Sequence, residues 1–271
     1  MRRPSPAAAR WLILVALLLL WEFLPATRIV PELFLPSLSK TLAVLWSDRA
    51  EYGRNLLVTL HEVALAMVIA CGAGILAGAL VGGIAVLRNL LLPVFSSLYA
   101  VPIVILYPIF TAWLGIGSES KIAFAGIYGF FPVMLSTAAG IRTIDPQLLL
   151  AARSMGATIG QQIARVIIPA SIPTVLTGLR LGGALTIIGV VVSEMLTAAA
   201  GIGYLVTRFR TILDSPRVFA AVLLILVLSV LFDVLARMVE RRTLVWQTAG
   251  RQGRTIPARA ATAATSTPAV A

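Results

Sequence analysis

The sequence predicts an all-α integral membrane protein with about six transmembrane helices and a polar, cytoplasmic insert between the fourth and the fifth. Hydrophobic residues make up 59% of the 271 residues and charged residues only 12%, whereas an ordinary soluble domain is about 25% charged. The mean hydropathy is +0.97. Several apolar runs approach or exceed the roughly 20 residues that a helix needs to cross a bilayer. This composition excludes a soluble protein with a large core.

The apolar runs define the expected spans and divide the chain into three parts. The spans cover about residues 11–24, 59–87, 91–114, 122–140, 172–199 and 218–238. Residues 1–54 comprise a basic segment, the first helix and an external loop or surface helix. Residues 55–240 form the transmembrane domain. Residues 241–271 are a cytoplasmic tail whose small and polar residues are typical of disorder.

The first apolar run has two interpretations. It follows the basic segment "MRRPSPAAAR", so it resembles the charged and apolar regions of a cleavable signal peptide. No small-x-small cleavage site follows it. The sequence therefore favours an uncleaved first helix, with a cleaved signal as the alternative.

The positive charges predict how the chain lies in the membrane. The net charge is +11, and the basic residues lie at both ends and between apolar runs. They form no single basic face, so no nucleic-acid partner is predicted. With six spans, both termini and the insert share one side, and that side holds most of the 22 lysines and arginines. The positive-inside rule then predicts a plasma (inner) membrane protein with both termini in the cytoplasm.

The insert, residues 145–171, is predicted to form two short helices with a hinge near Gly156 and Ala157. Asp145 followed by Pro146 is a strong helix start, because an N-cap oxygen precedes a proline whose missing N–H costs nothing. Gly156 suits the end of that helix, where a positive φ is often needed.

The second helix of the insert has its own start and stop signals. Thr158 and Gln161 have the spacing of a capping box, in which each side chain satisfies a backbone N–H of the other residue. Pro169 is expected to end this helix, because proline cannot continue the hydrogen-bond ladder.

One face of the insert is apolar, and two interpretations compete. The hairpin could lie flat on the membrane surface, or it could dock into a groove of a cytoplasmic partner. Only Arg153 and Arg165 bring positive charge to the polar face, which favours docking over a lipid surface. The apolar stripe consists of Leu148, Ala152, Met155, Ile159, Ile163 and Val166.

The insert resembles the cytoplasmic signature of ABC importer permeases. That consensus is Glu-Ala-Ala, three residues, Gly, nine residues, Ile, any residue, Leu-Pro. The chain has Ala151-Ala152, then Gly156, then "VIIP" ending at Pro169, with the same spacing. Leu150 stands where the consensus has glutamate. The segments "GIGSESKIAFAGIYGFFPVMLSTAAGIRTIDPQLL" and "PTVLTGLRLGGALTIIGVVVSEML" resemble the nitrate, sulfonate and taurine branch of the family, so the resemblance covers about residues 55–240.

This resemblance implies a type I ABC importer permease fold and a set of partners. The insert would be the coupling helix, received by a groove in a separate cytoplasmic ATPase subunit that binds the ATP. A solute-binding protein would dock outside, and a second permease subunit, expected to be an identical copy, would complete the path for nitrate, a sulfonate, taurine or a similar solute. The residues implied in ATPase coupling are Leu150, Ala151, Ala152, Gly156, Ala157 and Pro169.

A few polar residues inside the spans are candidates for lining the translocation path. Glu194 is the most notable, because a carboxylate within a span is costly and faces protein or water. A structural role, as a hydrogen-bond partner of a neighbouring helix, is the alternative for it. Ser136, Thr137 and Thr186 are milder candidates.

The sequence predicts no catalytic, metal or cofactor site. Neither Lys40 nor Lys121 follows a glycine, so the Gly-Lys pair of a P-loop is missing. His61-Glu62 begins like a zinc-protease motif, but Leu65 stands in place of the second histidine. The chain is therefore expected not to be an enzyme by itself. An ion-gradient-driven secondary transporter is the alternative function, although its inverted repeats and paired intramembrane charges are not evident.

Overall fold

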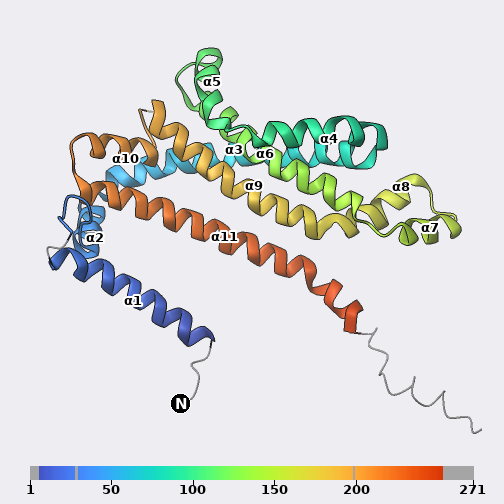
Figure 1. The fold of residues 1–271 in the computed structure, drawn as a ribbon, viewed down its shortest axis with the longest axis horizontal. Coiled ribbons are helices and arrows are strands. Elements are labelled where there is room, and N and C mark those ends of the chain that lie inside the picture. The colour runs from blue at the N-terminus through green and yellow to red at the C-terminus, as the bar shows by residue number, and fades with distance from the viewer. Residues whose placement is uncertain (1–5, 28–29, 198, 253–271) are drawn as a thin grey trace, which may run out of the picture.

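The computed structural model describes residues 6–27, 30–197 and 199–252, and every regular element in these ranges is helical (Figure 1). The predicted all-α class is therefore confirmed. The elements are α1 (Pro6–Ala26), α2 (Leu38–Ser47), α3 (Arg49–Gly83), α4 (Ala85–Ala100), η1 (Ile103–Leu106), α5 (Tyr107–Leu114), α6 (Ser118–Arg142), α7 (Pro146–Ser154), α8 (Ile159–Gln162), η2 (Ile163–Ile167), α9 (Ile168–Thr197), α10 (Ile202–Thr211) and α11 (Ser215–Gln252).

Four helices are long and apolar enough to cross a membrane: α3, α6, α11 and the continuous helix Ile159–Thr197. They correspond to four of the six expected spans. The apolar part of α1, Trp11–Ala26, matches the first expected span but is shorter than these four. Residues 241–252 continue α11 and are not part of an irregular tail, and the rest of the predicted tail, residues 253–271, lies outside the described residues.

The third expected span, 91–114, is not a straight helix. It consists of two helical segments, α4 and Ile103–Leu114, which meet at a short break and are bent relative to each other by 85°. Val101 is extended, with ψ 133°, because the ring of Pro102 disfavours a helical conformation in the residue before it. Pro108 then stands in the first turn of α5, where its missing N–H is tolerated. The sequence predicted correctly that this segment is apolar and helical, but a single straight span is wrong.

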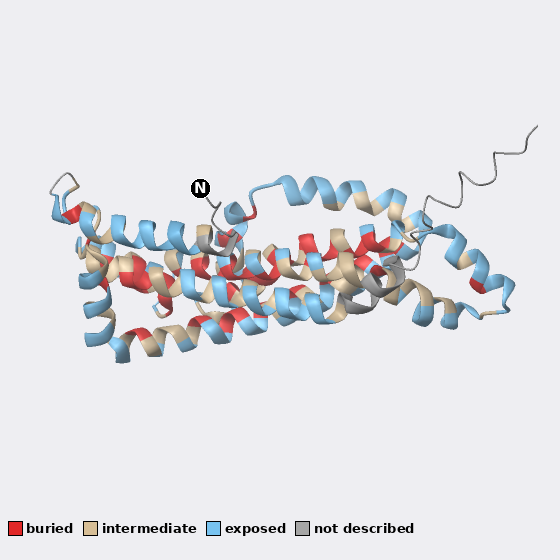
Figure 2. Ribbon diagram, turned by 90° about the horizontal axis from the view of Figure 1, so that it is seen from below, coloured by how far each residue is buried: buried red, intermediate tan, exposed pale blue. Residues whose placement is uncertain are grey.

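Helices α3, α6 and α9 form the core of the molecule, and most buried residues lie where they meet (Figure 2). Small residues allow this close approach. A β-carbon built on Gly78 of α3 would lie 2.5 Å from the carbonyl oxygen of Met134 in α6, and one built on Gly182 of α9 would lie 2.7 Å from that of Gly129. Any side chain at these positions would push the helices apart.

The chain enters α9 through a π-helical turn, so the helix does not end at Pro169 as predicted. Residues Ile163–Ile167 are π-helical and lead directly into α9. A π-turn shifts the hydrogen-bond pattern by one residue, and this shift accommodates the proline nitrogen, which has no hydrogen to donate. Because α8, η2 and α9 are continuous, the second half of the insert is a direct extension of a membrane-spanning helix.

The two ends of the bundle differ (Figure 1). Helices α7 and α8 project from one end, here called the insert end, and α2 and α10 lie at the opposite end, here called the far end. At the far end, the Arg217 guanidinium contacts Asp48 at 2.8 Å and Asp214 at 2.6 Å. The Arg217 guanidinium beside Asp48 holds the pKa of that carboxyl below its usual value of 3.8.

Candidate functional site

The first helix of the insert begins and ends with complete caps. A carboxylate oxygen of Asp145 accepts a hydrogen bond from the backbone N–H of Gln147 at 2.9 Å, and Pro146 occupies the first turn. At the other end, Gly156 has φ +76°. Its N–H donates to the carbonyl of Arg153, and the next N–H, of Ala157, donates to the carbonyl of Ala152. This pair of bonds is a Schellman motif, which turns the chain sharply after α7.

The second helix of the insert starts with the capping box that the sequence indicated. The backbone N–H of Thr158 donates to the side chain of Gln161 at 2.9 Å, and the N–H of Gln161 donates back to the Thr158 hydroxyl at 3.4 Å. Gln162 joins the two helices, because its amide accepts from Arg153 at 3.3 Å and donates to the carbonyl of Ala157 at 2.9 Å. The angle between α7 and α8 is thus set by local bonds.

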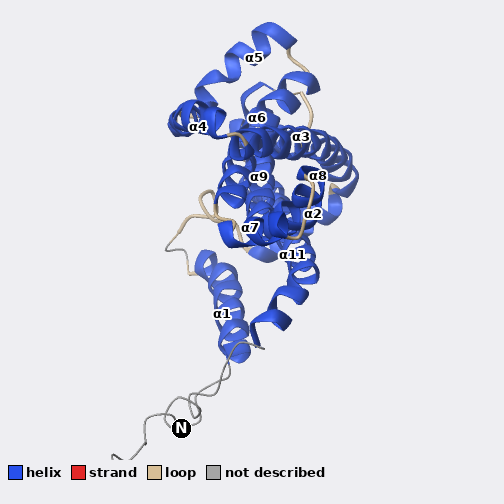
Figure 3. Cartoon of the chain, turned by 90° about the vertical axis from the view of Figure 1, so that its right-hand side faces the viewer, coloured by secondary structure: helices blue, strands red, loops and turns tan. Residues whose placement is uncertain are grey.

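Large apolar side chains of the insert are exposed. Met155 is 81% exposed, Ile159 76% and Leu150 66%. Of the predicted apolar stripe, Ala152 is buried at 5% exposure, so it supports the hairpin from within. Leu150 was not assigned to the stripe; two residues from both Leu148 and Ala152 in α7, it points to the other side of the helix and is also exposed. Figure 3, which looks at this end, shows α7 and α8 projecting toward the viewer.

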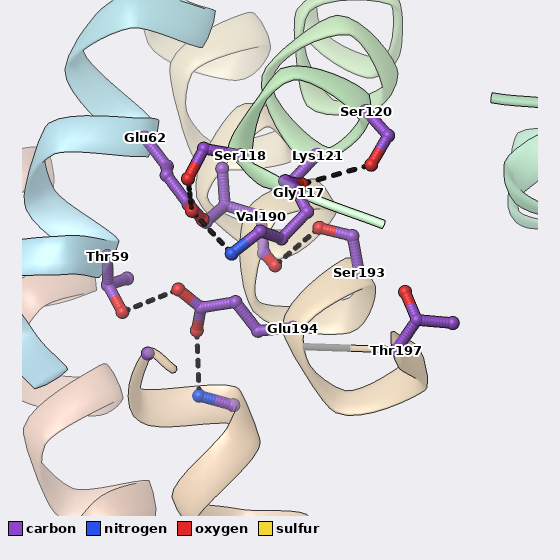
Figure 4. Close-up of polar contacts among 12 residues, drawn as sticks. Thr59, Glu62, Gly117, Ser118, Ser120, Lys121, Val190, Ser193, Glu194 and Thr197 are labelled. Carbon is purple, nitrogen blue, oxygen red and sulfur yellow. Dashed lines mark hydrogen bonds and ion pairs between the residues drawn. The ribbon is translucent and has the colours of Figure 1, made fainter. Parts of the chain in front are cut away.

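At the far end, α3 and α6 are joined by a buried ion pair. The ammonium of Lys121 contacts the carboxylate of Glu62, and the two side chains are 7% and 0% exposed. The hydroxyl of Ser118, in the first turn of α6, donates to the same Glu62 oxygen at 2.7 Å (Figure 4). Charges are expensive to bury singly, so each of the two side chains depends on the other for an opposite charge.

Glu194 lies beside this ion pair and joins three helices. Its carboxylate accepts from the Thr59 hydroxyl of α3 at 2.7 Å and from the backbone N–H of Gly203, in the first turn of α10, at 2.8 Å (Figure 4). A carboxylate is favourable at a helix N-terminus, where the backbone N–H groups are unpaired. Glu194 therefore makes the hydrogen bonds to neighbouring helices that the structural alternative predicted, and its place in a translocation path stays a prediction.

The other three path candidates also lie in helix packing. Thr137 and Thr186 are buried, and their hydroxyls donate to the carbonyls of Val133 and Gly182 in the preceding turn of their own helices. Ser136 is half-buried and faces Gly178 of α9. The cavity of about 190 Å³ beside Lys121 is lined by residues such as Val58, Tyr107 and Thr197, and neither the three path candidates nor Glu194 are among its lining residues.

Sequence reasoning missed the roles of Glu62, Lys121 and Thr59. The available signal was a charged residue inside or at the edge of an apolar run, but Glu62 was considered only as part of a metal motif. Among the residues that the structure describes, no three or more His, Cys, Asp or Glu side chains are grouped so that they could hold a metal ion.

These features define the class of protein. A bundle of membrane-spanning helices with a glycine-packed core, one strongly bent helix pair and a capped insert projecting from one end is typical of a multi-pass membrane protein. The chain belongs to the family of binding-protein-dependent transport system inner membrane components, whose model matches residues 70–245.

Known relatives agree with this assignment. The chain is 29% identical over 248 residues to the formylaminopyrimidine transport permease protein ThiX of Halalkalibacterium halodurans, covering 91% of this chain and 99% of the relative. It is 29% identical over 240 residues to the taurine transport system permease protein TauC of Escherichia coli, covering 86% and 87%. The fold resembles a chain of the inward-facing MetNI methionine ABC transporter, with a TM-score of 0.59, 18% identity, and coverage of 74% and 98%. The protein is the permease subunit of an ABC importer.

Proposed function

We propose that the α7–α8 insert receives energy from a separate ATPase subunit and that the chain moves a small solute such as taurine, another sulfonate or nitrate. The observation that carries the proposal is the exposure of three large apolar side chains, Leu150, Met155 and Ile159, on a projecting, rigidly capped hairpin. Helix docking into an apolar groove requires exposed apolar side chains. The hairpin that carries these side chains is shaped by Ala151, Ala152, Gly156 and Ala157. Pro169 lies in the first turn of α9, the span that the insert would move.

The continuity of the helices explains how a displacement of the insert would reach the core. Helix α6 ends at Arg142, three residues before the Asp145 cap, and α8 continues through η2 into α9. Both α6 and α9 therefore run from the insert to the far-end cluster of Lys121 and Glu194. A force applied to the insert would move α6 and α9 together, because glycines pack them closely.

Leu150 sets this chain apart from the family consensus, which has glutamate at that position. A leucine that is 66% exposed removes any ion pair that the glutamate would make with an ATPase and enlarges the apolar contact. We propose that the cognate ATPase presents an apolar side chain at this point.

The proposal requires the insert and both termini to lie in the cytoplasm. Reporter fusions after Arg88, within residues 157–165 and after Arg242 test this directly, and all three should report cytoplasm. A signal from the external side at any of them would contradict the proposed orientation.

We also propose that two permease chains, most simply two copies of this one, enclose the path, with a solute-binding protein docking at the far end. Helix α4 supports the pairing, because none of its side chains is buried within one chain. Cysteine cross-linking between two copies through α4 would test it, and exclusively monomeric chains in the active complex would contradict it.

The decisive experiment for the coupling role uses a charge placed on the exposed apolar surface. In the complex co-expressed with its ATPase and binding protein, Met155→Asp should reduce ATPase co-purification and solute uptake by about tenfold or more, since a charge would have to be desolvated in the groove. Gln147→Asp adds the same charge in the first turn of α7 and should leave both unchanged. Equal ATPase retention in the two variants would refute the docking role. Uptake of taurine compared with formylaminopyrimidine in the same complex tests the solute.

A further inference from the structure

A cavity of about 660 Å³ lies at the insert end, between the start of α4 and the end of α6. It is lined by Arg88, Asn89, Leu92, Pro93 and Arg142. The cavity is open on one side, because Asn89, Pro93 and Arg142 are exposed. Arg142 is the last residue of α6, so the cavity adjoins the segment that leads into the insert.

Both arginines of the cavity retain donors for a ligand. Within the part of the chain that the structure describes, neither guanidinium has a carboxylate at ion-pair distance. Arg88 donates one hydrogen bond, from Nη1 to the carbonyl of Gly82 at 3.3 Å, which leaves its other N–H groups available. Two positive charges that converge on one cavity without a counter-charge favour an anion.

We propose that this cavity binds a phosphate-type oxyanion, supplied by the headgroup of an anionic phospholipid. A guanidinium presents planar, paired N–H donors that match phosphate oxygens. Basic pockets between transmembrane helices at a membrane surface bind lipid headgroups. Leu92 and Pro93 form an apolar wall for the carbons of the lipid glycerol. The amide of Asn89 can form a hydrogen bond with a headgroup hydroxyl.

The surroundings favour a lipid over a free ion. The first turns of α4 beside the cavity expose Val86 at 74% and Leu90 at 65%, so apolar surface for acyl chains continues directly from the charged site. A bound headgroup would hold the start of α4 against the end of α6. Helix α4 would then be fixed beside the insert by lipid, although it buries none of its own side chains.

The test measures lipid binding and does not depend on transport. The permease–ATPase complex, purified in a neutral detergent, is titrated with phosphatidylglycerol, and bound lipid is counted by native mass spectrometry. Arg88→Gln/Arg142→Gln should weaken phosphatidylglycerol binding by about tenfold or more. The matched control is Arg241→Gln/Arg242→Gln, which removes the same charge from exposed arginines of α11 that do not line the cavity, and it should bind as the wild type does.

Two further arms identify the source of the oxyanion and guard against misfolding. Phosphatidylcholine should not replace phosphatidylglycerol, and millimolar inorganic phosphate should not displace it; displacement by phosphate alone would assign the site to a free ion and contradict the lipid source. Arg142→Gln alone changes an exposed side chain and serves if the double variant is unstable. Equal phosphatidylglycerol binding by the wild type and both cavity variants would overturn the proposal, and it would leave the coupling role of the insert unaffected.

Discussion

The hydroxyl of Thr59 donates a hydrogen bond to the Glu194 carboxylate at 2.7 Å and accepts one from the backbone N–H of Ile202 at 2.9 Å. The second Glu194 oxygen accepts from the N–H of Gly203. The start of α10 is therefore held by Glu194 of α9 and by two side chains of α3, Thr59 and Asn55, whose amide oxygen accepts from the N–H of Gly201 at 2.8 Å. Gly201, with φ +109°, makes this possible, because a β-carbon there would overlap the Glu194 carboxylate.

Removing the Glu194 carboxylate should therefore destabilise the far end of the bundle. Glu194→Ala leaves the Gly203 N–H without its acceptor, at a cost of about 1–3 kcal/mol for a buried unsatisfied group, whereas the Thr59 hydroxyl can still donate to the carbonyl of Asn55 at 3.2 Å. Glu194→Gln keeps one carbonyl acceptor, so it should lose much less. Thermal unfolding of the detergent-solubilised chain checks this order. A Glu194→Gln variant that abolishes uptake at wild-type stability would instead support a role in the path.

The buried pair of Lys121 and Glu62 should show strong coupling between the two positions. Lys121→Met leaves the Glu62 carboxylate buried without an opposite charge, which typically costs about 3–5 kcal/mol. Adding Glu62→Met removes that charge, and the double variant should recover most of the loss. The free energies of unfolding of the wild type, the two single variants and the double variant give the interaction energy. Additive losses would mean that the two side chains contribute independently.

Acid should weaken the contact between Asp48 and Arg217. The pKa of Asp48 is lowered by its hydrogen bond to Arg217 in the folded chain, so folding is favoured by the ionised form. This contribution is fully present above the ordinary value of 3.8, and it is lost as the pH falls below that value through the lowered folded pKa. The midpoint of thermal unfolding should therefore differ between the wild type and Asp48→Asn at neutral pH and converge in acid. A constant difference across this window would contradict the assignment.

Features set by neighbouring residues could be predicted from the sequence. The caps at Asp145 and Thr158 depend on a side chain and a backbone N–H only two or three residues apart, so their pattern is visible in the letters alone. The bend at Pro102 is also encoded locally, but the apolar run on both sides of the proline predicts a single span. The length of an apolar run indicates that it enters a membrane and does not indicate that it is straight.

Features that depend on how helices cross could not be predicted in the same way. The pairing of Lys121 with Glu62 requires α3 and α6 to meet at one height, and that height is set by the glycine contacts along both helices. Continuation of the helix through Pro169 depends on the π-turn before it, which the sequence does not mark. The assignment of Glu194 to a path or to packing likewise required the position of the α10 N-terminus.

The last prediction concerns the hinge of the insert. Gly156 has φ +76°, and a β-carbon there would have no atom within 4 Å, so Gly156→Val introduces backbone strain and no clash. The strain is on the order of 1–2 kcal/mol. Since the N-caps at Asp145 and Thr158 remain, α7 and α8 should still form, but their relative angle should change.

The expected consequence is weaker coupling in a chain that is still inserted normally. At equal membrane abundance, Gly156→Val should lower ATPase retention by roughly 5- to 30-fold if the strain is expressed as lost binding, and uptake should fall with it. Gly160→Val is the matched control, because this position is equally open and does not have a positive φ. It should retain more ATPase than Gly156→Val. Wild-type retention and uptake in Gly156→Val would show that the left-handed turn does not set the geometry that the ATPase recognises.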